Sequence, residues 1–231
     1  MSLNDPILPG PGATDYERYL RTDELLSLQK TADTWRHRDE LLFQTIHQTS
    51  ELWLKLAAAE VETATARIET DDVAGAVRLM RRAVDAIEIV NVNTRQLAHI
   101  APWDYHAVRA SLGHGSGFDS PGFRRTHDLS PKLGAAFSAL LARRGVTLLA
   151  LYRQSETHEE VFQLAERLLD WDERLILWRG LHLKAVERII GGHVIGTQGT
   201  PVEVLGKRID VRYFPELWDV RNQLTHLANG E

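Results

Sequence analysis

The chain has 231 residues, of which 43% are hydrophobic and 26% charged, with a formal net charge of -5 and no cysteine. This composition is ordinary for a globular protein with one substantial core, and the missing cysteine excludes disulfides, thiolate metal sites and thiolate-ligated haem. Acidic and basic residues are interspersed, and no apolar run is long enough to span a bilayer, so we expect a cytoplasmic protein without nucleic-acid or membrane partners.

Helical periodicity dominates the chain after a polar, proline-containing arm of about residues 1–14, which we expect to be flexible. Thr22 and Asp23 are expected to cap a short helix, and Pro215 to open the last one. In chain order, further helices are predicted over about residues 39–68, 73–100, 104–112, 131–144, 146–153, 159–190 and 215–227. No segment shows sustained period-two alternation. The prediction is a single all-α domain over residues 1–231, built as a bundle of long helices.

Two glycine-rich loops interrupt this pattern. The stretch from Gly113 to Gly122 holds four glycines in ten residues, which is incompatible with a regular helix or strand. Such a loop allows the backbone to approach a ligand or another segment closely. The second loop runs from Gly196 to Thr200, after Gly191 and Gly192 end the preceding helix.

Two of the ten histidines occur on apolar helical faces and carry the chemical argument. His47 shares a face with Phe43 beside the core stripe, and His182 lies on the stripe of the long helix before Gly191. A buried imidazole must be hydrogen-bonded or must bind a ligand. Neither histidine pairs with a second histidine or a carboxylate at chelate spacing, so a zinc or di-iron site is not expected. A hydrogen-bonded core histidine and a single axial haem ligand both remain open.

Ordered motifs narrow these alternatives. The chain contains Tyr16-x-x-Tyr19-Leu20, Asp39-Glu40-Leu41-Leu42-Phe43 continuing to Leu56, Tyr105-x-x-x-Arg109-x-x-Leu112-Gly113, Ser116-Gly117-Phe118-x-Ser120, Phe123-Arg124, Leu177-Trp178-Arg179, His182-x-x-x-Val186-x-Arg188-x-Ile190-Gly191, Gly196-Thr197-x-Gly199 and Tyr213-Phe214-Pro215-Glu216-Leu217. In this order they resemble the tryptophan 2,3-dioxygenase family. The resemblance covers nearly the whole chain except about residues 125–165.

The resemblance implies a helical haem dioxygenase, with haem b as cofactor and O2 as co-substrate. His182 falls at the position of the proximal ligand to the haem iron, and Ser116 and Gly117 fall in the loop beside the haem. The family is usually tetrameric, so a homo-oligomer (tetramer or dimer) is expected. In it the arm of one subunit carries Tyr16 and Tyr19 to a neighbour's active site.

The same resemblance implies the substrate contacts. His47 falls at the distal, catalytic position near the indole nitrogen, and Phe43 packs on the indole. Arg109, with Tyr105, falls where the family binds the substrate carboxylate, and Thr197 where a loop contacts the charged end. Without the resemblance, all of these would be read as ordinary packing, ion-pairing or turn residues. The expected reaction inserts O2 across the indole C2–C3 bond of L-tryptophan or a close analogue, giving an N-formylkynurenine-type product.

Three departures from the family pattern keep other functions open. The chain is short between Phe123 and the His182 helix, Gln198 and Val202 replace loop glycines, and Leu205-Gly206-Lys207-Arg208 stands where the family has an arginine-threonine run. One alternative is a haem-dependent monooxygenase of a modified tryptophan that gives an oxindole or hydroxylated product. Another is a non-catalytic helical protein that binds haem or a partner.

Overall fold

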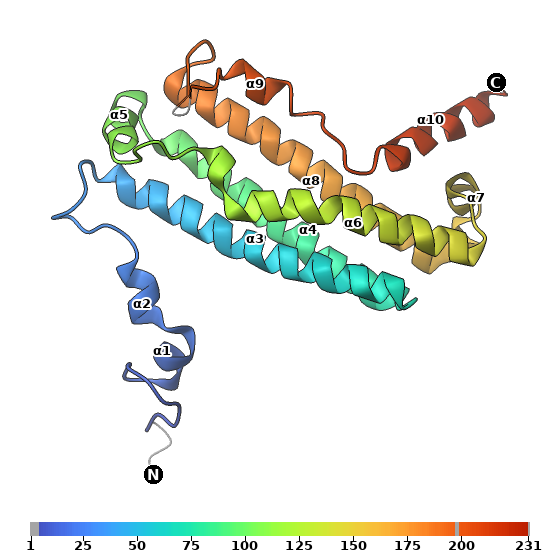
Figure 1. Cartoon of the computed structure of the whole chain (residues 1–231), viewed down its shortest axis with the longest axis horizontal. Coiled ribbons are helices and arrows are strands. Elements are labelled where there is room, and N and C mark those ends of the chain that lie inside the picture. Colours follow the sequence, from blue (N-terminus) through green and yellow to red (C-terminus); the bar gives the residue numbers. More distant parts are fainter. Residues whose placement is uncertain (1–4, 197–198, 231) are drawn as a thin grey trace.

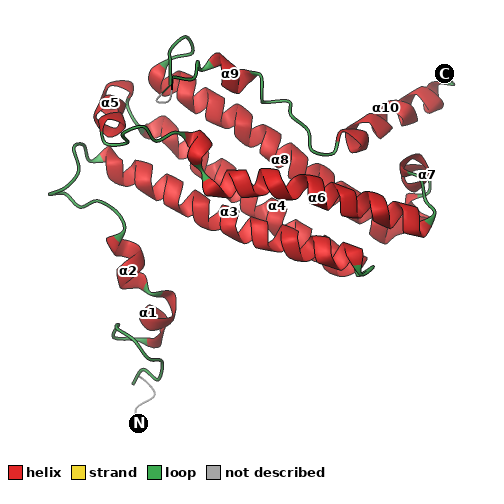
Figure 2. Ribbon diagram, viewed as in Figure 1, coloured by secondary structure: helices red, strands yellow, loops and turns green. Residues whose placement is uncertain are grey.

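The computed structural model describes residues 5–196 and 199–230. Within these ranges the chain is helical and forms no β-sheet, which confirms the all-α prediction (Figure 2). The elements are α1 (Asp15–Leu20), α2 (Thr22–Ser27), α3 (Asp39–Glu69), α4 (Val73–Arg95), η1 (Gln96–His99), α5 (Pro102–Ala110), η2 (Gly117–Asp119), α6 (Pro121–Arg144), α7 (Leu148–Arg153), η3 (Ser155–His158), α8 (Glu159–Ile190), α9 (Glu203–Gly206) and α10 (Pro215–Asn229).

Four long helices, α3, α4, α6 and α8, lie side by side and form the core (Figure 1). α4 packs between α3 and α8, while α6 lies against the other side of α3. Small buried residues such as Ala57 and Ala64 on α3 and Ala76 and Ala83 on α4 allow these two helices to approach closely. α5 and α9 gather at one end of the bundle, and α7 and α10 gather at the other.

The long helices follow the predicted boundaries closely, with one clear error. α3 and α8 begin at the predicted residues, and α4 follows Asp72, whose side chain accepts a hydrogen bond from the Gly75 amide at 2.9 Å. α6, however, begins at Pro121 rather than Pro131, because Pro121 occupies the first turn and Ser120 caps it. Pro131 lies inside the helix. It costs about 3 kcal/mol in an isolated helix, which burial of neighbours such as Leu133 offsets here.

The end of α4 and the starts of two short helices also differ from prediction. α4 stops at Arg95 and continues as the 3-10 turn η1 instead of running to about Ile100. α5 opens two residues earlier than predicted, at Pro102, because a proline is well suited to the first helical position. α2 starts at Thr22 after Arg21, which has φ 54°, so the predicted Thr22 cap lies one residue inside the helix.

The N-terminal segment extends away from the bundle (Figure 1). Residues 7–12 are folded back on α1, where Asp15 accepts from the Leu8 amide at 2.7 Å and Arg18 donates to the Gly12 carbonyl at 2.9 Å. The base of the segment is tied to α3, since the Lys30 amide donates to Gln44 at 2.8 Å. Several large apolar side chains are exposed along it, namely Ile7, Tyr16, Tyr19, Leu26 and Leu28. No helix among the described residues is long and apolar enough to cross a membrane.

A buried carboxylate fixes the C-terminal segment to the bundle. Asp172 of α8 has no exposed surface. It accepts hydrogen bonds from the backbone amides of Tyr213 and Phe214, at 2.9 and 3.3 Å, and from the indole N–H of Trp218 at 3.0 Å. A buried charge is tolerated when donors surround it in this way.

Replacing Asp172 with alanine is therefore expected to lower the free energy of unfolding by roughly 2–4 kcal/mol, since three buried N–H donors lose their acceptor. Urea denaturation followed by circular dichroism measures this change. Glu173→Ala is the matched control, because the neighbouring Glu173 is solvent-exposed and, in the part of the chain that the structure describes, pairs with Arg174 alone. An equal loss of unfolding free energy in both variants would show that Asp172 does not fix the C-terminal segment.

Candidate active site

One cavity of about 790 Å³ opens between α3, α5, α6 and α8. Its volume lies in the range of small-molecule and cofactor sites. Most of the residues that the sequence pointed to line it together: Phe43, His47, Tyr105, Arg109, Ser116, Gly117 and His182.

His182 presents an unpaired imidazole to this cavity. Its ring stacks on Trp178 with centroids 5.1 Å apart and planes 12° from parallel, and Trp178 stacks on Phe123 at 3.6 Å. Among the described residues, neither ring nitrogen of His182 has a hydrogen-bond partner. Burial, and secondarily the nearby His47, lowers the pKa of His182 to about 4. The ring is therefore neutral at physiological pH and keeps a lone pair for a ligand.

The glycine-rich loop passes in front of this ring. A Cβ atom on Gly117 would lie 3.5 Å from Nε2 of His182 and 3.6 Å from Cε1, so a side chain there would contact the ring edge that carries Nε2. The loop is shaped by Gly113, with φ 58°, and by the capping of η2, in which Ser116 and Asp119 exchange hydrogen bonds. A neutral imidazole opposite a bare backbone fits a cofactor that needs one strong axial ligand.

His47 lies on α3 and is also neutral. Its Nδ1 lies 2.7 Å from the Phe43 carbonyl oxygen, which can only accept, so Nδ1 carries the proton and Nε2 is left as an acceptor. Its ring stacks on Phe43 at 4.0 Å. Burial lowers the pKa of His47, against opposing effects of the Phe43 carbonyl and the Glu51 charge. The residue also lines the cavity.

Arg109 and Tyr105 lie one turn apart on α5. Arg109 donates from Nη2 to the Ile195 carbonyl at 3.3 Å and forms no ion pair with a carboxylate among the described residues. Burial raises the pKa of Tyr105, partly opposed by Arg109, so the phenol stays protonated. A guanidinium satisfied only by one carbonyl retains donors for an incoming carboxylate.

Two predicted site residues are not brought into this cavity, and the position of a third is not described. Tyr16 and Tyr19 lie on α1, 69% and 78% exposed, and do not line the cavity of their own chain. Thr197 lies outside the described residues. The predicted roles of all three stay predictions.

Several cavity residues received no role from the sequence. Glu51 and Trp178 stand one helical turn from His47 and His182, so the i, i+4 spacing was a usable signal for both. Three guanidinium groups also line the cavity, from Arg124, Arg179 and Arg208. Arg208 lies over the Phe118 ring at 5.3 Å, and neither Arg124 nor Arg208 pairs with a carboxylate among the described residues. These cations come from separate elements, so no local pattern marks them as a group.

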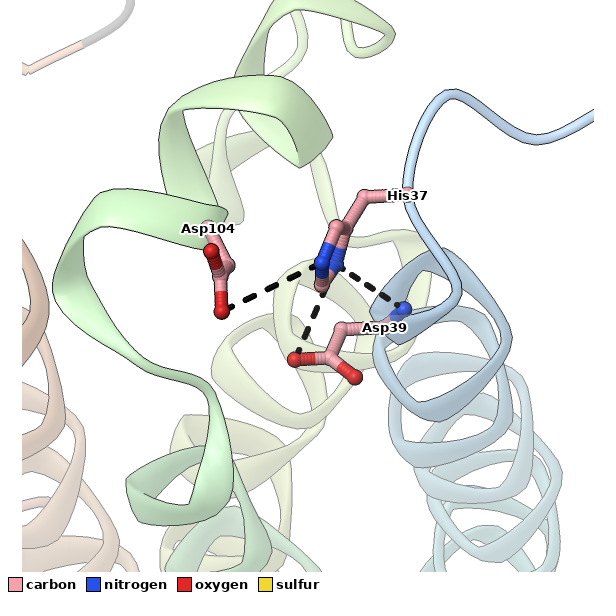
Figure 3. Close-up of side chains that lie close together, drawn as sticks. All are labelled: His37, Asp39 and Asp104. Atoms are coloured by element: carbon pink, nitrogen blue, oxygen red, sulfur yellow. Dashed lines mark hydrogen bonds and ion pairs between the residues drawn. The ribbon is translucent and has the colours of Figure 1, made fainter.

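Among the described residues one other group has the spacing of metal ligands: His37, Asp39 and Asp104 (Figure 3). Nδ1 of His37 lies 3.8 Å from Asp39 and Nε2 lies 3.9 Å from Asp104, so the two nitrogens face different carboxylates. Nδ1 also accepts the Asp39 amide at 3.3 Å, which occupies its lone pair. The ring therefore links the first turns of α3 and α5 outside the cavity, and we assign it no metal.

Comparison with known proteins gives a consistent picture. A family model described as tryptophan 2,3-dioxygenase matches residues 4–139 and 124–224. The tryptophan 2,3-dioxygenase of Caulobacter vibrioides is 36% identical over 90% of this chain and 98% of its own length. Those of Myxococcus xanthus and Bacillus anthracis are 31% and 33% identical, over 93% and 90% of this chain and 91% and 92% of their own. The two segments that match the family model overlap at residues 124–139. This overlap falls where the chain is shorter than the family pattern.

The protonation state of His182 can be tested directly. In protein prepared without cofactor, its ring carbon resonances should titrate near pH 4, because burial disfavours the imidazolium form. NMR of histidine-labelled protein measures the midpoint, and the missing signals of His182→Ala give the assignment. A midpoint near the ordinary value of 6.5 would show that the ring is solvated.

Proposed function

The chain belongs to the tryptophan 2,3-dioxygenase family, and from that premise we propose that it is a haem-dependent dioxygenase of L-tryptophan or a close analogue. The observation that carries the proposal is the neutral, unpartnered His182 sharing one cavity with His47. The comparisons favour neither the monooxygenase nor the non-catalytic alternative.

His182 would bind the iron of haem b, and its ring stacks on Trp178, which in turn stacks on Phe123. Arg124, Arg179 and Arg208 offer guanidinium groups for the two acidic propionates of a haem. Ser116 and Gly117 would lie in the loop beside the haem, where Gly117 adds no side chain next to His182. When bound with its iron reduced, haem supplies the binding and activation of O2.

The remaining cavity residues would bind and orient the indole amino acid. Phe43 and Tyr105 provide apolar walls for the ring, and Nε2 of His47 accepts the indole N–H. Arg109 exchanges its carbonyl partner for the substrate carboxylate, with which it forms two parallel hydrogen bonds worth about 1.5–3 kcal/mol each. The predicted contact of Thr197 with the charged end belongs to the same arrangement.

The proposed reaction is balanced by its two substrates alone. The indole C2–C3 bond breaks, one oxygen atom of O2 joins each carbon, and the product is of the N-formylkynurenine type. His47 then serves to position the indole, because a neutral imidazole with one free acceptor fixes the ring orientation. No strong base is required, in agreement with the absence of a carboxylate pair in the sequence motifs.

The N-terminal segment supports an oligomer. It is folded and joined firmly to α3, yet Tyr16, Tyr19 and Leu26 remain exposed, which is unusual for a segment that has no partner. We propose that it packs on another copy of the chain, in a tetramer or dimer, and that Tyr16 and Tyr19 reach the neighbour's cavity.

Isotope labelling tests the reaction itself. With 18O2 and L-tryptophan, the product should carry two labelled atoms, since both oxygen atoms enter the indole. Mass spectrometry under single-turnover conditions limits later exchange with water. A product with one labelled atom would show a monooxygenase, and no consumption of L-tryptophan by haem-loaded, reduced protein would remove the enzyme proposal.

Removing the guanidinium tests the role of Arg109. Arg109→Ala should weaken L-tryptophan binding at least about tenfold, the equivalent of losing one charge-assisted hydrogen bond, and more if both bonds are lost. The affinity for indole, which has no carboxylate, should stay within error. Perturbation of the haem absorption band measures both affinities. Equal losses for the two ligands would mean that Arg109 does not bind the carboxylate.

A further inference from the structure

Glu51 joins α3 to the start of α6, and both elements contribute residues to the cavity lining. It lies on α3 one turn after His47, and its carboxylate accepts hydrogen bonds from the Ser120 hydroxyl and from the Gly122 amide, the latter at 3.0 Å. Ser120 and Gly122 form the beginning of α6, 69 and 71 positions further along the chain. No cation pairs with Glu51 among the described residues, so its charge is held by these donors and by the N-terminus of α6.

A continuous series of contacts leads from this carboxylate to His182. The Ser120 hydroxyl that donates to Glu51 also accepts the Phe123 amide at 3.1 Å, which caps α6. The Phe123 ring stacks on Trp178, and Trp178 stacks on His182. Trp178 is fixed further by its indole N–H, which donates to Thr94 at 3.1 Å. A shift of the start of α6 would therefore move Phe123 and Trp178 and, through them, change the orientation of the His182 ring.

The start of α6 lies too close to α3 for any residue but glycine. A Cβ atom on Gly122 would stand 2.6 Å from Cβ of Leu54 and 2.7 Å from Oε2 of Glu51. The backbone of α6 is thus pressed directly against the Glu51 carboxylate. The glycine-rich loop that ends here also carries Gly117 in front of His182, so the same attachment sets the loop.

We propose that Glu51 is a positioning residue that holds the start of α6 and the preceding loop on α3, and so keeps His47, Gly117 and His182 in register. The attachment stands on the contacts alone, whereas its effect on turnover rests on the function proposed above. The Glu51 charge also acts on His47 directly: it raises the pKa of that imidazole, against the larger lowering effect of burial.

Glu51→Gln is the informative variant. It keeps the size of the side chain but removes the charge, and its amide nitrogen cannot accept a hydrogen bond from Ser120 or Gly122. Glu62→Gln is the matched control, since Glu62 also lies on α3 and pairs with Arg125 of α6 but does not line the cavity. Ser120→Ala is the second variant, because it keeps the carboxylate and its bond to the Gly122 amide but removes the hydroxyl that both donates to Glu51 and caps α6.

In haem-loaded protein, hydrogen exchange of residues 113–123 should accelerate about tenfold or more in Glu51→Gln, with the rest of the bundle unchanged. The rate of haem loss to apomyoglobin should rise, and kcat should fall about tenfold while KM for L-tryptophan changes little, because misplacement acts on the reacting geometry. Ser120→Ala should show the same changes in smaller measure, and Glu62→Gln none of them.

Two results would overturn the proposal. Unchanged exchange at residues 113–123 in Glu51→Gln would show that the carboxylate does not hold the loop, whether or not the protein binds haem. Accelerated exchange with unaltered haem loss and kcat would reduce Glu51 to a helix cap. If wild-type protein neither retains haem nor consumes L-tryptophan, the proposed function fails, and the exchange comparison alone decides the attachment.

Discussion

The site depends on one constraint, which is that the imidazole of His182 lines the cavity and has no hydrogen-bond partner among the described residues. An imidazole placed in this way can bind a ligand without first giving up a hydrogen bond within the protein. The surrounding residues hold the His182 ring without hydrogen-bonding its nitrogens. Trp178 stacks on the ring and Phe123 stacks on Trp178, while Gly117 has no side chain. The cavity is thus built to leave one nitrogen available to a ligand.

The long helices supply the rigidity that such a site needs. His182 and His47 belong to α8 and α3, which both pack against α4 in the core, so their backbones are fixed far from the cavity as well as near it. Burial keeps both rings neutral, but their free atoms serve different purposes. In His47 the Phe43 carbonyl selects the tautomer and leaves an acceptor. No hydrogen bond among the described residues selects the tautomer of His182, so a bound ligand would select it.

Local patterns predicted the parts of this structure that depend on local physics. Helical periodicity placed His47 and His182 on apolar faces, while Asp72 located the start of α4 and Gly191 the end of α8. Pro131 misled the prediction of α6, because the packing that carries a helix through a proline comes from distant residues. The Glu51–Ser120 hydrogen bond could not be predicted, since it joins positions 69 residues apart with no motif between them. The same holds for Arg208, whose place over Phe118 depends on the path of a loop.

The most direct test of the account is the absorption spectrum of purified protein, oxidised and reduced, for the wild type and for His182→Ala, each reconstituted with haem. We expect stoichiometric haem in the wild type and loss of haem in His182→Ala. Added imidazole should restore haem binding in the variant, because it replaces the missing ligand. His47→Ala serves as the control and should keep its haem. Full haem occupancy with an unchanged spectrum in His182→Ala would show that His182 does not bind the haem iron.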